Sequence, residues 1–138
     1  MIVVFGHPPN YEKIKKRFPL FEGVVFTYGN VIYNPNRIQI DSALLKHEEV
    51  HSRQQEEIGI ESWWNRYIES PDFRLSQEVE AHQAEYKEYK KRIKDKNQSF
   101  RTLRALALRL SDSLYGDIIS YEKAKEAIES DKPIAFDV

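Results

Sequence analysis

The sequence has no cysteine in its 138 residues. Disulfide bonds and thiolate metal sites are therefore excluded, and any zinc ion would have to be held by histidine and carboxylate side chains. The chain also has no internal repeat and no low-complexity segment. A chain of this length and ordinary soluble composition is expected to form one domain over residues 1–138.

Long apolar runs and an excess of charge of one sign are missing as well. The apolar start, residues 1–5, lacks a basic region and is too short for the core of a signal peptide. No stretch approaches the run of about 20 apolar residues that a membrane helix needs. With a net charge of -1, the whole chain has no field that points to nucleic acid or a membrane. We therefore expect a cytoplasmic protein without a membrane partner.

The first 40 residues have the pattern of a small sheet. A short buried strand is predicted at residues 2–5, and a short basic helix at residues 10–18 ends before Pro19. Three more apolar runs are separated by Gly29-Asn30 and by Asn34-Pro35-Asn36, which are typical turn sequences. These runs cover residues 24–28, 31–33 and 37–40. We therefore predict a small antiparallel meander.

From Asp41 onward the pattern is helical. Asp41 is a good N-cap and Gly59 a good stop, which predicts a helix over residues 42–58. Ser70 and Pro71 open a second helix that continues to about residue 94. Shorter helices are predicted at residues 60–68, after Ser99 as N-cap, and at 120–130. The predicted fold class is α+β, with a small antiparallel sheet followed by a helical bundle.

Residues 47–51 read His-Glu-Glu-Val-His, an H-E-x-x-H motif inside the predicted helix 42–58. Residues four apart lie on the same side of a helix, so His47 and His51 can share one cation. Glu48 lies about 100° around the helix and can reach a water on the metal without binding the metal. Zinc lowers the pKa of a bound water from about 15.7 towards 7, and Glu48 can take its proton. Two surface histidines and a solvated glutamate are the alternative.

A catalytic zinc ion takes three protein ligands and keeps one open position. The helix from residue 71 has an apolar stripe formed by Leu75, Val79, His82, Tyr86, Tyr89 and Ile93. Glu78 lies about 60° from the centre of this stripe and Glu80 about 140° from it. Glu78 is therefore the predicted third ligand, and Glu80 is predicted to face solvent. Glu85, about 80° from the centre, also flanks the stripe.

The H-E-x-x-H motif, followed by Glu78-x-x-Ala81, resembles the gluzincin metallopeptidases, whose pattern is H-E-x-x-H and then E-x-x-A-D on two packed helices. The plan is similar to minimal single-domain gluzincins and to small phage-encoded metallopeptidases. The motifs cover residues 37–86, and the rest agrees only in layout. The resemblance implies a zincin-like fold and zinc-dependent hydrolysis of a peptide or protein substrate. In this reading His47, His51 and Glu78 hold zinc, and Glu48 is the general base.

This chain departs from the family at His82, where the family has an aspartate that orients a ligand histidine. The imidazole of His82 could make that hydrogen bond, could approach the metal itself, or could simply pack in the core. A peptidase also needs a donor to the oxyanion, for which Tyr86, Tyr89 and Tyr115 are candidates. We favour Tyr115 because it precedes Gly116 in a break between helices. Residues 37–40 are the predicted edge strand for an extended substrate.

Residues 87–109 are rich in lysine and arginine, with Tyr89 and Phe100 among them. This pattern could form an arm that binds nucleic acid, and the zinc site would then be non-catalytic. Two solvated helix faces give the same pattern, and Glu88 and Asp95 dilute the positive charge. A non-catalytic, zinc-containing module that binds nucleic acid is therefore the alternative function, and nucleic acid is the less expected partner.

Overall fold

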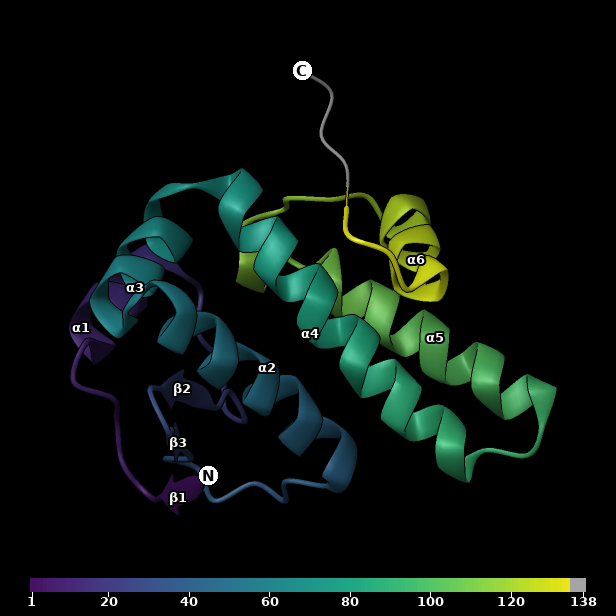
Figure 1. The fold of residues 1–138 in the computed structure, drawn as a ribbon, viewed down its shortest axis with the longest axis horizontal. Helices are drawn as coiled ribbons and strands as arrows, with labels where there is room; N and C mark the ends of the chain where they lie inside the picture. Colours follow the sequence, from purple (N-terminus) through teal and green to yellow (C-terminus); the bar gives the residue numbers. More distant parts are fainter. Residues whose placement is uncertain (135–138) are drawn as a thin grey trace.

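The computed structural model describes residues 1–134 of the chain. Within them lie three short strands, six α-helices and one 3-10 helix (Figure 1). In chain order the elements are β1 (Ile2–Val4), α1 (Tyr11–Arg17), β2 (Phe26–Tyr28), β3 (Val31–Tyr33), α2 (Ser42–Ile58), α3 (Ile60–Glu69), α4 (Pro71–Arg92), α5 (Lys96–Leu110), η1 (Ser113–Tyr115) and α6 (Tyr121–Ser130). The predicted α+β class is confirmed. No helix among residues 1–134 is long and apolar enough to cross a membrane.

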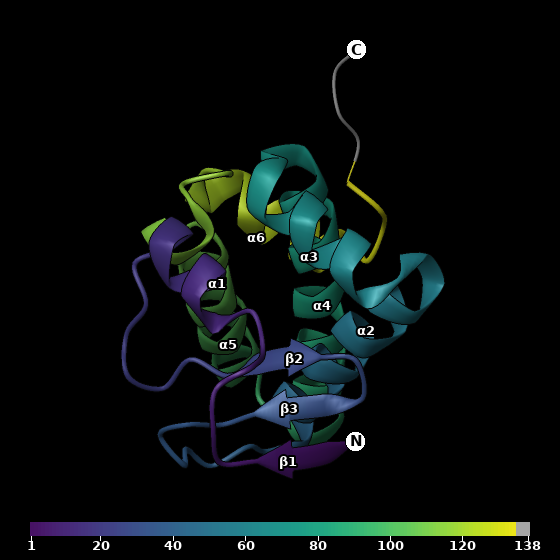
Figure 2. The ribbon, with the colours of Figure 1, turned by 90° about the vertical axis from the view of Figure 1, so that its left-hand side faces the viewer.

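The sheet is mixed, with strand order β1-β3-β2. The hairpin of β2 and β3 is antiparallel, and Gly29, with a φ of 63°, occupies its two-residue turn. However, β1 pairs with β3 in parallel, so the prediction of an antiparallel meander is wrong. Helix α1 lies between β1 and β2 in the chain and allows β1 to join in the parallel sense. Figure 2 shows β1 at the edge away from the helices, and Ile2 is 59% exposed, so β1 is not the buried strand we expected.

Residues 37–40 do not form the predicted strand. The side chain of Asn34 organises this segment by accepting from the backbone N–H of Ile38 (3.0 Å) and donating to the carbonyl of Ile38 (2.9 Å). Arg37 adopts a left-handed conformation with a φ of 52°, which a continuing strand does not allow. The segment is therefore a side-chain-stabilised loop.

The caps of the two long helices agree with the sequence. Asp41 accepts from the backbone N–H of Leu44 (2.8 Å), and α2 ends at Gly59. Ser70 accepts from the N–H of Phe73 (3.2 Å), and α4 begins at Pro71. Helix α5 begins four residues earlier than predicted because Asp95, and not Ser99, is its N-cap.

Two apolar clusters flank the pair of long helices. One joins α4, α5 and α6 around Leu103 and Leu110, and the other joins α1, β2 and α3 around Trp63. Helices α2 and α4 pack side by side, with α5 on the other side of α4 (Figure 1). The H-E-x-x-H motif therefore faces α4 in the interior.

Candidate metal centre

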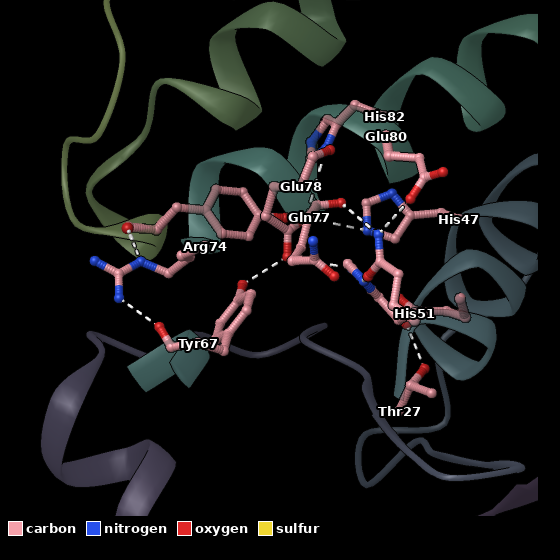
Figure 3. A network of polar contacts seen from close by, with 12 residues as sticks. Thr27, His47, His51, Tyr67, Arg74, Gln77, Glu78, Glu80 and His82 are labelled. Carbon is pink, nitrogen blue, oxygen red and sulfur yellow. Dashed lines mark hydrogen bonds and ion pairs between the residues drawn. The ribbon is translucent and has the colours of Figure 1, made fainter. Parts of the chain in front are cut away.

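The two motif histidines point at one carboxylate on α4. His47 Nε2 lies 3.4 Å from Glu78 Oε1, and His51 Nε2 lies 3.2 Å from Glu78 Oε2 (Figure 3). The three residues are between 3% and 5% exposed. A tetrahedral metal site with bonds of about 2.0–2.1 Å has ligand atoms about 3.3–3.4 Å apart, so each histidine lies at about this spacing from one oxygen of Glu78.

The other nitrogen of each imidazole has its own partner. His47 Nδ1 lies 2.9 Å from Glu85 Oε1, and His51 Nδ1 lies 2.8 Å from Gln54 Oε1. Acceptors at Nδ1 fix the ring and leave Nε2 as the atom that binds a metal. Burial would lower the pKa of His47, but the carboxylates of Glu78 and Glu85 outweigh it and raise the pKa to about 10. The pKa of His51 is also raised, because Glu78 overcomes the effect of burial. The two carboxylates therefore favour a positive charge at this place in the fold.

The surroundings of Glu78 also favour a metal ion at this place. Burial would raise its pKa, yet His51 and His47 hold the pKa of this carboxyl well below its usual range. Oε2 accepts from the Tyr67 hydroxyl at 2.6 Å, but Oε1 is buried without a hydrogen-bond partner. An unpaired buried carboxylate oxygen is costly. Its position beside His47 Nε2 fits a ligand to a metal ion.

His82 is part of the same buried cluster. His47, Glu78 and His82 form a group that could bind a metal ion, with one ligand atom of each within 4.8 Å of the others. However, His82 Nδ1 lies 2.7 Å from the backbone carbonyl of Glu78, and its Nε2 accepts from Arg109 Nε at 3.2 Å. Both ring nitrogens of His82 therefore already have hydrogen-bond partners, whereas His51 Nε2 lies next to the Glu78 carboxylate and is the better candidate for a metal ligand. Burial, together with Arg109, holds the pKa of His82 well below its usual range, so it is neutral.

Of the alternatives for His82, a hydrogen bond to a motif histidine is not seen: its Nδ1 contacts the backbone carbonyl of Glu78, and Glu85 is the residue that contacts His47 Nδ1. Arg109 of α5 contacts both Glu85 and His82 and links this helix to the site. Sequence reasoning noted that Glu85 flanks the stripe, but no local signal identified Arg109, which is distant in the chain. Its inward orientation also removes Arg109 from the basic surface predicted for residues 87–109.

Glu80 lies outside the cluster, as the helix phase predicts. Its side chain is 47% exposed and pairs with Arg53 Nη2 at 2.6 Å. Its Oε1 accepts from Gln54 Nε2 at 2.8 Å. Glu80 therefore touches the site only through the amide that orients His51.

Glu48 opens onto a cavity of about 80 Å³ next to the three candidate ligands. Its Oε2 accepts from the Thr27 hydroxyl of β2 at 2.5 Å. Thr27 therefore fixes the carboxylate, a role that no sequence pattern indicated. The remaining lining is mostly aromatic and aliphatic, and is contributed by α1, β2, α3, η1 and the segments around them: Ile14, Phe18, Leu20, Val24, Val25, Phe26, Trp63, Trp64, Tyr67, Leu114 and Tyr115.

Of the three candidate tyrosines, only Tyr115 lines this cavity. The hydroxyl of Tyr86 contacts Ser99, and that of Tyr89 donates to Asp41. Burial and the negative charge of Glu78 raise the pKa of Tyr115 well above its usual range, so its phenol remains a donor at neutral pH.

The strand nearest the cavity is β2, and not the predicted segment 37–40. The Thr27 carbonyl on its outer edge accepts from Gln55 Nε2 (2.8 Å) and Trp64 Nε1 (3.2 Å). This carbonyl is therefore already used within the fold.

Comparison of the chain with protein families, curated proteins and solved structures finds no match. The features of the chain that point to a function are therefore the H-E-x-x-H motif and the geometry of this buried cluster.

Proposed function

We propose that this protein is a zinc-dependent hydrolase of peptide bonds with a zincin-like fold of the gluzincin type. The observation that carries the proposal is the position of the Glu78 carboxylate opposite Nε2 of both His47 and His51, with Glu48 in the same cavity. His47, His51 and Glu78 would hold the metal. When bound, zinc would polarise the scissile carbonyl and lower the pKa of a water molecule towards about 7.

Glu48 acts as the general base. Its carboxylate takes a proton from the water as the water oxygen attacks the carbonyl carbon, and the Thr27 hydroxyl keeps it in place. The proton then passes from Glu48 to the amide nitrogen as the C–N bond breaks, which gives a carboxylate and an amine. The phenol of Tyr115 donates a hydrogen bond to the negative charge that develops on the carbonyl oxygen.

The second candidate is a non-catalytic zinc module that binds nucleic acid. The observation in its favour is burial, since a closed site suits a structural metal. The basic segment 87–109 gives only weak support for nucleic-acid binding, because several of its cationic side chains already have partners within the protein. Lys87 pairs with Asp131 and Lys91 with Glu88, while Arg109 turns inward.

The first test measures the metal content of the untagged protein by elemental analysis, followed by cleavage of an unbiased peptide library. The proposal predicts one zinc ion per chain and hydrolysis that a chelator abolishes and zinc restores. A zinc-loaded protein that cleaves nothing, but binds DNA or RNA with an affinity that falls steeply with salt, would favour the second candidate.

A further inference from the structure

We infer that Tyr67 is a positioning residue that makes Glu78 bind the metal through Oε1 alone. The inference rests on the metal centre proposed above, but not on peptide hydrolysis.

The two oxygens of Glu78 have different surroundings. Oε2 accepts from the Tyr67 hydroxyl at 2.6 Å. Oε1 has no hydrogen-bond partner and lies 3.4 Å from His47 Nε2, whereas Oε2 also lies 3.2 Å from His51 Nε2. An oxygen that already accepts from a phenol is a weaker ligand than a free one. Each oxygen faces one motif histidine, and only Oε1 does so without a hydrogen-bond partner of its own.

The fold holds the Tyr67 phenol in place independently of Glu78. Its ring stacks on Trp63, with centroids 4.8 Å apart and planes 21° apart. Its carbonyl accepts from Arg74 Nη1 at 2.6 Å, and Arg74 Nε donates to the carbonyl of Tyr115 at 2.8 Å. Arg74 is fully buried, so one guanidinium ties both tyrosines of the cavity to α4. These contacts fix the position of the Tyr67 hydroxyl, and its hydrogen bond in turn fixes the position of Glu78 Oε2.

The consequence concerns the open position of the metal. A catalytic zinc ion with three single-atom ligands keeps a fourth position for water. A carboxylate that binds through both oxygens takes up that position or raises the coordination number. Tyr67 prevents this by holding Oε2.

The test is Tyr67→Phe, which removes only the hydroxyl. Tyr86→Phe is the matched control, because Tyr86 is a buried tyrosine of α4 whose hydroxyl contacts Ser99 outside the cavity. The measurements are the zinc Kd by competition with a chelator, the visible absorption of the Co²⁺-substituted protein, and the unfolding midpoint of the metal-free protein.

We expect Tyr67→Phe to weaken zinc binding by about ten- to a hundredfold. Its Co²⁺ absorption should lose intensity, because a carboxylate bound through both oxygens raises the coordination number from four to five. Tyr86→Phe should leave the zinc Kd and the Co²⁺ spectrum unchanged.

Three results would overturn the inference. One is an unchanged Co²⁺ spectrum in Tyr67→Phe with an unchanged zinc Kd. Another is an unchanged spectrum with weaker zinc binding and a lower metal-free unfolding midpoint, which would give Tyr67 a structural role only. The third is a parent protein that binds neither zinc nor Co²⁺. That result refutes the proposed metal centre itself, whereas the first two leave the centre standing.

Discussion

Replacing Glu78 by alanine should remove most of the zinc affinity, whereas replacing Glu80, two residues away, should not. Glu78 is 3% exposed and faces both motif histidines, while the side chain of Glu80 is 47% exposed and faces Arg53. Protein zinc sites with four ligands bind with about 10–16 kcal/mol, so one ligand accounts for about 3 kcal/mol. Since 1.4 kcal/mol is a factor of ten, Glu78→Ala should weaken binding by about a hundredfold.

Proton competition makes this loss depend on pH. Glu78 also helps to raise the pKa of His47 to about 10, so zinc must displace a proton from His47 in the parent protein. Without Glu78, that pKa falls and zinc meets less competition at pH 7. The loss caused by Glu78→Ala should therefore be larger at about pH 9 than at pH 7.

Glu80→Ala is the control for the same helix turn. It removes an exposed ion pair with Arg53, which is worth about 0.2–1 kcal/mol. Gln54 keeps its second bond, from Nε2 to the carbonyl of Gln77 at 3.1 Å, and so still orients His51. Zinc affinity should therefore stay within about twofold of the parent. The assay is chelator competition at both pH values. If Glu78→Ala keeps parental affinity at about pH 9, or if Glu80→Ala loses it, the assignment of the third ligand is wrong.

Three further predictions concern the motif. His47→Ala and His51→Ala each leave two protein ligands, so zinc content by elemental analysis should collapse, and stoichiometric zinc in both variants would disprove the site. Glu48→Gln keeps the shape but cannot take a proton, so zinc content should persist while peptide turnover falls by about a hundredfold or more; undiminished turnover would exclude Glu48 as the base. Because the pKa of His47 is raised to about 10, zinc binding at pH 7 should release at least one proton, and the zinc affinity should rise by about tenfold per pH unit for each proton displaced. Titration calorimetry in two buffers of different ionisation enthalpy measures the number of protons released. Zinc binding without proton release would contradict a protonated His47.

Local chemistry explains which elements the sequence could predict. Asp41 and Ser70 cap their helices with their own side chains, so the starts of α2 and α4 depend on a few neighbouring residues. The direction of β1 depends on pairing with Val31, far along the chain, and the loop at 37–40 depends on a single side chain, that of Asn34. The hydrophobic pattern of the sequence indicates neither the direction of β1 nor the loop at residues 37–40.

The candidate site shows the same limit. Helix phase separates Glu80 from Glu78, since Glu78 lies about 60° from the centre of the buried stripe and Glu80 about 140° from it. Phase places both Glu78 and Glu85 beside the stripe and cannot say which one binds the metal. The two glutamates differ in their position along the axis of α4. Glu78 therefore lies next to Nε2 of His47, and Glu85, two turns further on, lies next to Nδ1 of the same ring. Residues from other elements, such as Thr27, have no periodic signal at all.

The charges of the cluster explain how one arrangement can serve both with and without metal. The pKa values of Glu78 and Glu85 are held low by their cationic neighbours, and these carboxylates in turn raise the pKa values of His47 and His51. A positive charge between these side chains is therefore favoured, and a metal ion at the proposed site would supply such a charge in place of protons. Arg109 balances Glu85 in either state. Two apolar clusters, one on α4, α5 and α6 and the other on α1, β2 and α3, hold the elements around the site together, so the fold does not depend on a metal ion alone.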